Sequence, residues 1–333
     1  MDWRKGFTAQ YHMCIVDPTT WRDTNIVHIT DGTIKKEQSS LMQSADVDCV
    51  KYPQGERWIR IWLNATQNGV TETIPMFTGL AVSPDRDING LIETNSVECY
   101  SVLKPADDVL LDRGWYAPAG FTGSSIVRQL LEVSPAPIVE DDFSPSLSTS
   151  IIAEDGETRL SMAEKILNSI NWRLRIDGDG TIHICPKAQE PIATFDAIEM
   201  DIIEPQIKLS SDWYDAPNVF RAIEDDLIGI ARDDSPDSPL STVNRGREIW
   251  KEELNCDLAD NETVAEYAYR KLKELQAQEI TGRYNRRFIP DIVPTDMINL
   301  HLPAQQIDGQ FIITSQSIKL GYGAAVTEEV EKA

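Results

Sequence analysis

A run of alternating aspartates and glycines, DGDGT at Asp177–Thr181, is the segment of this sequence that most resembles a metal site. Carboxylates at this spacing are oxygen ligands of calcium loops, which also need a glycine at the sixth position and a distal glutamate. Here the sixth position is Ile182, and further apolar strand residues follow it. We therefore interpret the run as the turn of a β-hairpin and predict no metal site.

The histidines and cysteines give no metal-binding pattern. The four histidines are His12, His28, His183 and His301. None is spaced as HxxxH or HExxH, so we interpret them as isolated residues, with His183 and His301 on strand faces. The five cysteines are Cys14, Cys49, Cys99, Cys185 and Cys256. They are odd in number and never form CxxC, which predicts free thiols.

Other candidate motifs also have structural interpretations. Gly120–Ser125 (GFTGSS) lacks the lysine of a phosphate-binding loop, so we expect Ser124 or Ser125 to cap a helix there. There is no GxSxG elbow. The acidic clusters Glu140–Asp142, Glu224–Asp226 and Asp233–Asp237 lie in predicted turns, where solvated charge is expected. We predict no enzyme activity, no catalytic residue and no cofactor.

The tryptophans leave two interpretations open. In RWIRIWLNAT, Ile59, Ile61 and Leu63 share one strand face, and Trp58 and Trp62 share the other. The two rings could form a second packed layer or a subunit contact. Together with Trp115 they could also form a platform on which a sugar stacks.

The amino-acid composition further restricts the classes of protein to which this chain can belong. The 333 residues include 54 acidic and 31 basic side chains, a formal charge of −23. This argues against a protein that grips nucleic-acid phosphates, because such binding relies on Lys and Arg. No apolar run of 18 residues and no signal-peptide core are present, so neither a membrane span nor secretion by a signal peptide is expected.

The elements divide the chain into three parts. Residues 1–119 are mostly strands, among them 46–52, 74–82 and 92–103. Residues 120–189 contain two helices, the second opening with a capping box of Ser161 and Glu164, and then a hairpin around DGDG. Residues 190–333 return to strands, with one long helix at about 260–278 and a polar tail that we expect to fray.

The order of these pieces resembles a known family. It runs ITDGTIKKEQSSLMQSADVDC, MFTGLAVSPDRDINGLIETNSVECYSVLKPADD, a helix, GETRLSMAEKILNSINWRLRIDGDGTIHICP, DAPNVFRAI, ETVAEYAYRKLKEL, PTDMINLHLP and GQFIITSQSIKLGYG. Over nearly the whole chain it is similar to the baseplate hub proteins of contractile-tail phages, defective prophages and contractile bacteriocins. The resemblance rests on motif order, so no individual contact residue can be transferred.

The resemblance implies a fold and a set of partners. The fold would be α+β, mainly β, with two tube-like antiparallel β-barrel domains (1–119 and 190–333) and an inserted small α/β region (120–189). Three subunits would form a ring that adapts the hexameric tail tube above to the trimeric central spike below, within the surrounding baseplate proteins. The chain would assemble in the host bacterial cytoplasm and lie in the tail baseplate, without specific nucleic-acid binding.

Two other functions remain open from the sequence. One is a β-rich protein that binds carbohydrate or processes glycans through Trp58, Trp62 and Trp115. The other is a tail-tip adhesin that contacts the host. If the chain does line a channel, we expect the channel wall to be more acidic than the outer rim, because an acidic wall repels polyanions.

Overall fold

The computed structural model describes residues 1–38, 41–53, 55–82, 85–89, 92–196, 203–211, 214–224, 227–254, 256, 262–277, 280–303 and 307–333. Strands dominate these residues, and the predicted class, α+β and mainly β, is confirmed. Most strands belong to one thirteen-stranded sheet. None of the described helices is long and apolar enough to cross a membrane.

The N-terminal strands close into a ring. They are β1 (Thr8–Asp17), β2 (Arg22–Glu37), β3 (Gln43–Val50), β4 (Arg57–Gln67), β5 (Val70–Ala81) and β7 (Ile92–Ser101). Neighbours pair antiparallel in the order β1–β4–β5–β7–β3–β2, and β2 pairs back with β1. β6 (Asp85–Asn89) pairs with β7. Asn68 and Gly69 connect β4 to β5 with φ values of 51° and 80°, as a two-residue hairpin turn of type I′ requires.

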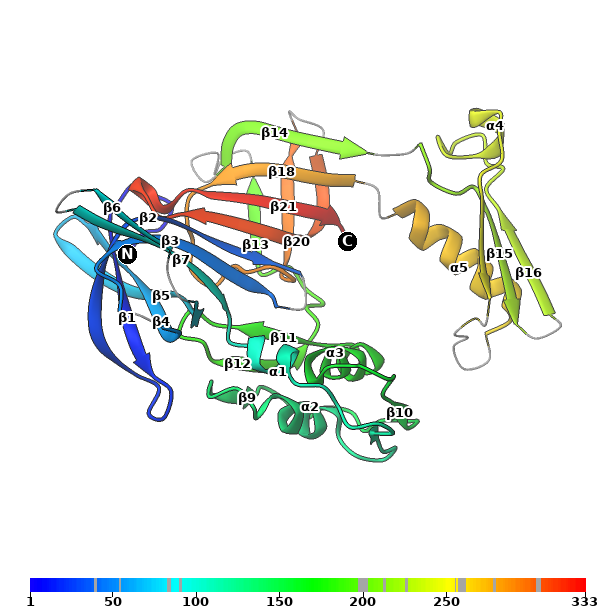
Figure 1. The fold of residues 1–333 in the computed structure, drawn as a ribbon. Helices are drawn as coiled ribbons and strands as arrows, with labels where there is room; N and C mark the ends of the chain where they lie inside the picture. The colour runs from blue at the N-terminus through cyan, green and yellow to red at the C-terminus, as the bar shows by residue number, and fades with distance from the viewer. Residues whose placement is uncertain are drawn as a thin grey trace.

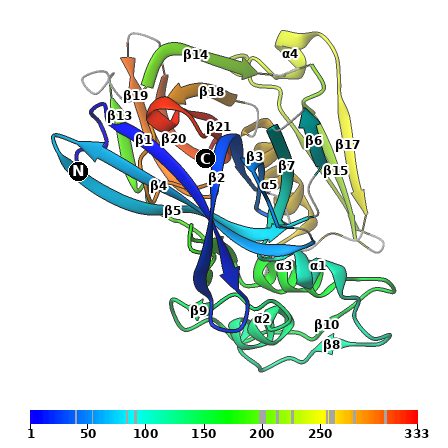
Figure 2. The same ribbon diagram turned by 60° about the vertical axis from the view of Figure 1, so that its left-hand side comes forward.

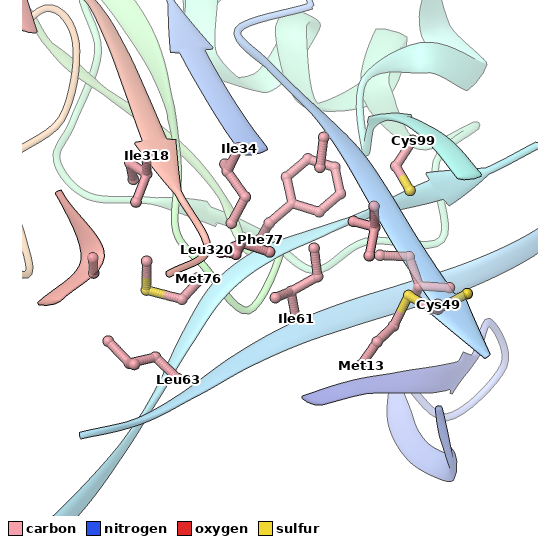
Figure 3. Packing of buried hydrophobic residues seen from close by; sticks show 14 of the residues in the cluster. Met13, Ile34, Cys49, Ile61, Leu63, Met76, Phe77, Cys99, Ile318 and Leu320 are labelled. Carbon is pink, nitrogen blue, oxygen red and sulfur yellow. The ribbon is translucent and has the colours of Figure 1, made fainter. Parts of the chain in front are cut away.

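Side chains fill the inside of this ring. Ile59, Ile61 and Leu63 of β4 are fully buried, as the alternating pattern of the sequence predicts. Ile318 and Leu320, from the end of the chain, pack into the same core (Figure 3). The ring is therefore a packed core through which no channel runs, and its core depends on the C-terminal strands.

The C-terminal strands continue the same sheet. They are β13 (Ala193–Asp196), β14 (Ile203–Ser211), β18 (Ile280–Arg286), β19 (Met297–Leu302), β20 (Ile307–Lys319) and β21 (Val326–Lys332). β20 pairs with β2 of the ring and with β19 and β21, while β21 leads on to β18 and β14. β13 pairs with β19. Within the described residues β13 and β14 do not pair with each other, so the closure of a second barrel stays a prediction.

The expectation that the polar tail frays is wrong. The tail forms β21, which lies between β18 and β20. Its Glu328 is fully buried and pairs with Arg286 at 2.7 Å between Oε1 and Nη2. Glu328 also accepts hydrogen bonds from Tyr284 Oη at 2.5 Å and Gln316 Nε2 at 2.7 Å. Because a buried carboxylate is costly without such partners, this network ties the last strand to the sheet.

A small module lies below the ring (Figure 1, Figure 2). We define the module as residues 104–186. Its elements are α1 (Lys104–Asp108), β8 (Tyr116–Ala117), α2 (Gly123–Leu131), β9 (Ile138–Glu140), β10 (Ile151–Ile152), α3 (Arg159–Ser169), β11 (Trp172–Ile176) and β12 (Ile182–Pro186). The predicted hairpin is confirmed as the antiparallel pair β11–β12. β9 joins β12 in parallel and completes the three-stranded sheet of the module.

Both helix starts in the module differ from the predictions. The N-cap of α2 is Thr122 and makes no side-chain cap; instead Ser144 Oγ accepts the backbone N–H of Ser124 at 2.8 Å. The capping box of α3 consists of Thr158 and Ser161 rather than Ser161 and Glu164. Ser161 is thus the third helical residue. Its hydroxyl accepts the backbone N–H of the N-cap residue, which is the hydrogen bond that we predicted for the carboxylate of Glu164.

Residues 214–277 form an arm with its own hydrophobic core. Its elements are β15 (Val219–Glu224), β16 (Leu227–Arg232), α4 (Thr242–Arg245), β17 (Trp250–Leu254) and α5 (Val264–Ala277). α5 corresponds to the long helix predicted at about 260–278, and it covers one face of the three-stranded sheet through Tyr267 and Leu272. Figure 1 shows the arm standing to one side of the large sheet. The division at residues 119 and 189 stays a prediction.

Candidate functional site

The DGDG turn joins the module to the ring. Within the turn, Gly180 N–H donates to the carbonyl of Asp177 at 2.9 Å, and Gly180 has a φ of +85°, which favours glycine. Thr78 Oγ1 of β5 donates to the carbonyl of Gly178 at 2.8 Å, and Trp21 Nε1 donates to the carbonyl of Asp179 at 3.0 Å. The turn therefore makes tertiary hydrogen bonds in addition to reversing the chain.

The fit at this junction requires a glycine. A Cβ added to Gly178 would lie 1.9 Å from the carbonyl oxygen of Pro75, which is backbone and cannot rotate away. The sequence identified these residues as a turn. Their close approach to β5 could not be found from local spacing.

Arg60 is the centre of the junction. It is only 6% exposed, and its Nη2 donates to the carbonyl of Asp179 at 2.9 Å. Its Nη1 pairs with Asp23 Oδ1 at 2.6 Å, and its Nε donates to Thr78 Oγ1 at 3.0 Å. The guanidinium carbon also lies 6.0 Å from the centre of the Trp21 ring. One planar cation thus joins β2, β4, β5 and the module, with each of its three guanidinium nitrogens donating to a different partner.

A second junction ties the module to the C-terminal strands. Arg173 of β11 donates from Nη2 to Asp296 Oδ1 at 2.8 Å and from Nη1 to Thr295 Oγ1. Asp296 is 1% exposed and also accepts the backbone N–H of Val293 at 3.0 Å. Both arginines therefore fix the module, one against the ring and one against the strands that follow it.

A cavity of about 210 Å³ lies where the ring, the module and the C-terminal strands meet. Burial lowers the pKa of Lys36, on its wall, to about 8, and the charge of Asp177 opposes that shift. Arg175 and Arg286 also line the cavity, as do Asp179 and Asp291. Because three basic residues meet three acidic ones, the cavity has no excess charge that would select an ion.

His12 and His28 lie on the paired strands β1 and β2, whereas His183 and His301 lie on β12 and β19. His183 Nδ1 lies 2.7 Å from Asp141 Oδ1, and its Nε2 lies 3.2 Å from Asp177 Oδ2, so it bridges two carboxylates at the module surface. His301 pairs with Asp308 at 3.0 Å on a strand face, as predicted. Among the described residues, no group of three or more His, Cys, Asp and Glu side chains is arranged to hold a metal ion.

The three candidate tryptophans do not form one platform. Trp58 lies 5.5 Å from Trp21, ring centre to ring centre, and both pack against the module core, as Trp115 also does. Trp62 donates from Nε1 to Asp23 Oδ2 at 2.7 Å. Trp58 thus belongs to the contact between ring and module, which fits the interpretation as a second packed layer.

The acidic clusters are only partly solvated. Asp233 is 5% exposed and accepts hydrogen bonds from Ser238 Oγ at 2.5 Å and Gln276 Nε2 at 3.1 Å, so the expectation of solvated charge is wrong there. Glu140 pairs with Arg128 at 3.3 Å. In the cluster Glu224–Asp226, residues 225 and 226 lie outside the described residues.

Sequence reasoning missed the junction residues Trp21, Arg60, Thr78 and Arg173. The available signal was an arginine inside an apolar alternation, at Arg60 and again at Arg173. A buried arginine must be paired, which marks such a position as a tertiary contact without naming its partner.

Comparison with known proteins identifies the fold. No family model matches the chain, and no curated protein matches it in sequence. The 43 kDa tail protein of prophage MuSo2 from Shewanella oneidensis is similar in structure, with a TM-score of 0.71, 13% identity and 98% of each chain covered. The tail protein from Neisseria meningitidis MC58 has a TM-score of 0.68 at 15% identity, over 98% of this chain and 97% of that one.

A third solved structure is the E. coli c3393 protein, a component of the type VI secretion system that is similar to the T4 bacteriophage tail proteins gp27 and gp5. Its TM-score is 0.50 at 9% identity, and the match covers 92% of this chain and 74% of that one. These likenesses extend over the ring, the module and the arm together. The chain therefore has the fold of phage-type tail proteins along nearly its whole length.

Proposed function

We propose that this chain is a structural hub of a phage tail or phage-like particle, without enzymatic activity. The observation that carries the proposal is the match of the whole chain, ring to arm, to the prophage tail protein at a TM-score of 0.71. An end-to-end match favours a shared architectural role over the reuse of one domain in another setting.

The physical construction suits such a role. Two buried or largely buried arginines hold the module against both β regions, and the core of the ring takes side chains from both ends of the chain. We expect the ring, the module and the C-terminal strands to move as one body. A component that transmits force between a tube and a spike needs that rigidity.

The proposal includes the assembly. Three copies form a ring, each contributing two β domains (1–119 and 190–333) with the region 120–189 inserted between them. The six β domains match the hexameric tail tube above, and the threefold ring holds the trimeric central spike below. A closed cyclic ring also covers strand edges that would otherwise remain free. Because side chains fill the interior of each N-terminal ring, the channel lies between copies, and its wall is acidic.

The location follows from the assembly. The chain is assembled in the host cytoplasm and resides in the baseplate of the particle, in contact with the tube, the spike and surrounding baseplate proteins. It neither binds nucleic acid specifically nor spans a membrane.

Chemical crosslinking of purified particles tests the copy number. The crosslinked products of this 37.4 kDa chain should end at the trimer. A ladder that continues to six copies, or a chain that crosslinks only to other proteins, would contradict the proposal. Crosslinking in diluted, dissociated samples is the control, because mass action separates subunits that only meet by chance.

A further inference from the structure

Lys36 of β2 lines the cavity where the ring, the module and the C-terminal strands meet. Its neighbours across the sheet are Gln43 of β3 and Gln316 of β20. Residues directly opposite each other in antiparallel strands share one face of the sheet, so two neutral amides flank the lysine. Among the described residues, no side chain forms an ion pair or a hydrogen bond with the amine of Lys36.

Two buried polar atoms near Lys36 also have no hydrogen-bond partner in the described part of the chain. They are Nε of Arg175, a donor on β11, and Oε1 of Gln43, an acceptor. Arg175 lines the cavity together with Lys36, and both residues also line a smaller pocket beside it, which Gln43 borders. Buried polar atoms are normally paired, so each unpaired one requires an explanation. Here an unpaired donor and an unpaired acceptor lie around one amine.

Arg175 is the cation of the cavity wall that remains available to an added negative charge. Arg286 also lines the cavity, but buried Glu328 neutralises it through an ion pair of 2.7 Å. Arg175 Nε lies 3.4 Å from Asp177 Oδ1, a contact too poorly aligned to count as a hydrogen bond. The Nε–H of Arg175 therefore lacks an acceptor within the described ranges.

The carboxylates around the cavity are engaged elsewhere or screened by water. Asp177 Oδ2 lies 3.2 Å from His183 Nε2, and Asp179 Oδ1 accepts a backbone N–H at 2.9 Å. Glu37 and Asp291 are exposed, so solvent screens their charges. These carboxylates oppose a new anion in the cavity less than buried, unpaired ones would.

Burial makes the amine of Lys36 a nucleophile near neutral pH. Burial lowers its pKa to about 8, although the charges of Asp177 and Asp291 raise it. At pH 8 about half of the amine is therefore uncharged, compared with about 0.4% for a lysine whose pKa is 10.4. Only the uncharged amine has the lone pair that attacks an electrophile. The cavity of about 210 Å³ has room for a small one, since a single water needs only about 10–15 Å³.

We propose that Lys36 is a site of carbamate formation, at which its amine adds carbon dioxide and the product is held by Arg175 and Gln43. The lone pair of Nζ forms the new N–C bond, while one C=O electron pair of CO₂ moves onto oxygen. The nitrogen then releases one proton to water. RNH₂ and CO₂ thus give RNHCOO⁻ and H⁺, and nothing is oxidised or reduced.

The carbamate would pair both unpaired atoms at once. Its carboxylate accepts the Nε–H of Arg175, and its remaining N–H donates to Oε1 of Gln43. Because CO₂ itself is uncharged, the balanced charges of the cavity do not hinder its entry. The modification would add a bond between the ring and the module. The proposal goes beyond the hub function and does not depend on it.

Chemical trapping on the full chain tests the proposal without any substitution. The chain is incubated at pH 8 with carbon-13 bicarbonate, which supplies dissolved CO₂, and a triethyloxonium salt then esterifies any carbamate so that it survives digestion. Mass spectrometry of the peptides should find at least about tenfold more label on Lys36 than on Lys35, because far more of the Lys36 amine is uncharged. Lys35 is the internal control, since it is the next residue and its side chain is 56% exposed. A free tripeptide, whose α-amine has a pKa of about 7.7–8.0, is the positive control for the supply of CO₂.

Two results of the trapping experiment would overturn the proposal. One is comparable labelling of Lys36 and Lys35, which would mean that the cavity confers no reactivity. The other is the absence of label on Lys36 while the tripeptide is labelled.

Variants followed by carbon-13 NMR test the partners of the carbamate. Lys36→Arg keeps the positive charge without a nucleophilic amine and should abolish one carbamate resonance, which the matched control Lys35→Arg should retain. Arg175→Gln should lower the carbamate fraction about two- to fivefold, as expected for a partly exposed ion pair. Arg113→Gln is its control, because the Arg113 side chain is 88% exposed and pairs with Asp155. A carbamate spectrum that is unchanged in Lys36→Arg, or a fraction that is unchanged in Arg175→Gln, would contradict the proposal.

Discussion

Gly178 of the module lies directly against the carbonyl oxygen of Pro75 in the ring, so close that a Cβ on Gly178 would stand 1.9 Å from that oxygen. The contact lies between two segments that supply separate hydrophobic cores, since Met76 belongs to the core of the ring and Ile176 to that of the module. It explains why the DGDG turn carries a glycine at a position whose own backbone angles do not demand one. The module is thereby fixed to the ring by the shape of its backbone as well as by side chains.

Gly178→Ala should destabilise this contact. The added methyl group forces the turn away from β5, and overpacking of this kind costs about 1–3 kcal/mol in the free energy of unfolding. Urea titration of the purified chain measures the effect. Gly321→Ala is the matched control, because a Cβ there meets nothing within 4 Å. Equal stability of both variants would show that the turn does not pack tightly against β5 of the ring.

The ion pair between Arg60 and Asp23 should show strong coupling in a double-mutant cycle. The Arg60 side chain is 7% exposed and that of Asp23 is 26% exposed, so water screens the pair only in part. For Arg60→Met and Asp23→Asn we expect a coupling energy of about 1–3 kcal/mol, typical of residues in one hydrogen-bonded network. The pair Arg113–Asp155, with side chains 88% and 75% exposed, is the control and should give about 0–0.5 kcal/mol. Similar values for both pairs would refute the central role of Arg60.

All five thiols should be free and protected by the fold. Each cysteine is buried, and burial raises the pKa of Cys14 and of Cys49 to about 11. At pH 8 the folded chain therefore has little thiolate and should react slowly with a thiol reagent. After denaturation without reductant, all five should be labelled. Fewer than five labelled cysteines would reveal a disulfide.

Stability should fall at strongly alkaline pH. Burial raises the pKa of Tyr11 to about 12 and that of Tyr284 well above its usual value of 10.0. Above pH 10 the unfolded chain loses protons that the folded chain keeps, so the free energy of unfolding decreases by up to about 1.4 kcal/mol per pH unit for each such tyrosine. Lys36 has the opposite effect and raises the free energy of unfolding with pH between about pH 8 and 10.5. The first value is the pKa of Lys36 in the folded chain, and the second is its usual pKa.

The alkaline effect is therefore measured above pH 10.5, by urea unfolding at several pH values. Tyr284→Phe is the test variant and should flatten the decline. A slope that does not change in Tyr284→Phe would show that this phenol ionises in the folded state as it does in the unfolded chain.

The features that could be predicted from the sequence are those that depend on residues close together along the chain. Alternation revealed the buried face of Ile59, Ile61 and Leu63, and the DGDG spacing revealed the hairpin. It could not reveal the junction, because Arg60 and Asp179 are 119 positions apart. The tail was misjudged for the same reason: Glu328 looks solvated until Arg286, 42 positions away, is placed beside it.

The arm shows a different limit of sequence reasoning. Its strands alternate like those of the large sheet, and nothing local indicates that Phe220 packs under α5 in a core of its own. Periodicity gives the buried face of an element but not the partner that buries it. Folding of a long β-rich chain into separate units is decided by contacts between distant segments.

A reconstruction of the purified particle at a resolution that traces the chain tests the hub proposal most directly. It should show three copies of this chain in one closed ring between the tail tube and the central spike, with two β domains of each copy facing the tube. Six copies, one copy, or a position at the periphery of the particle would contradict it.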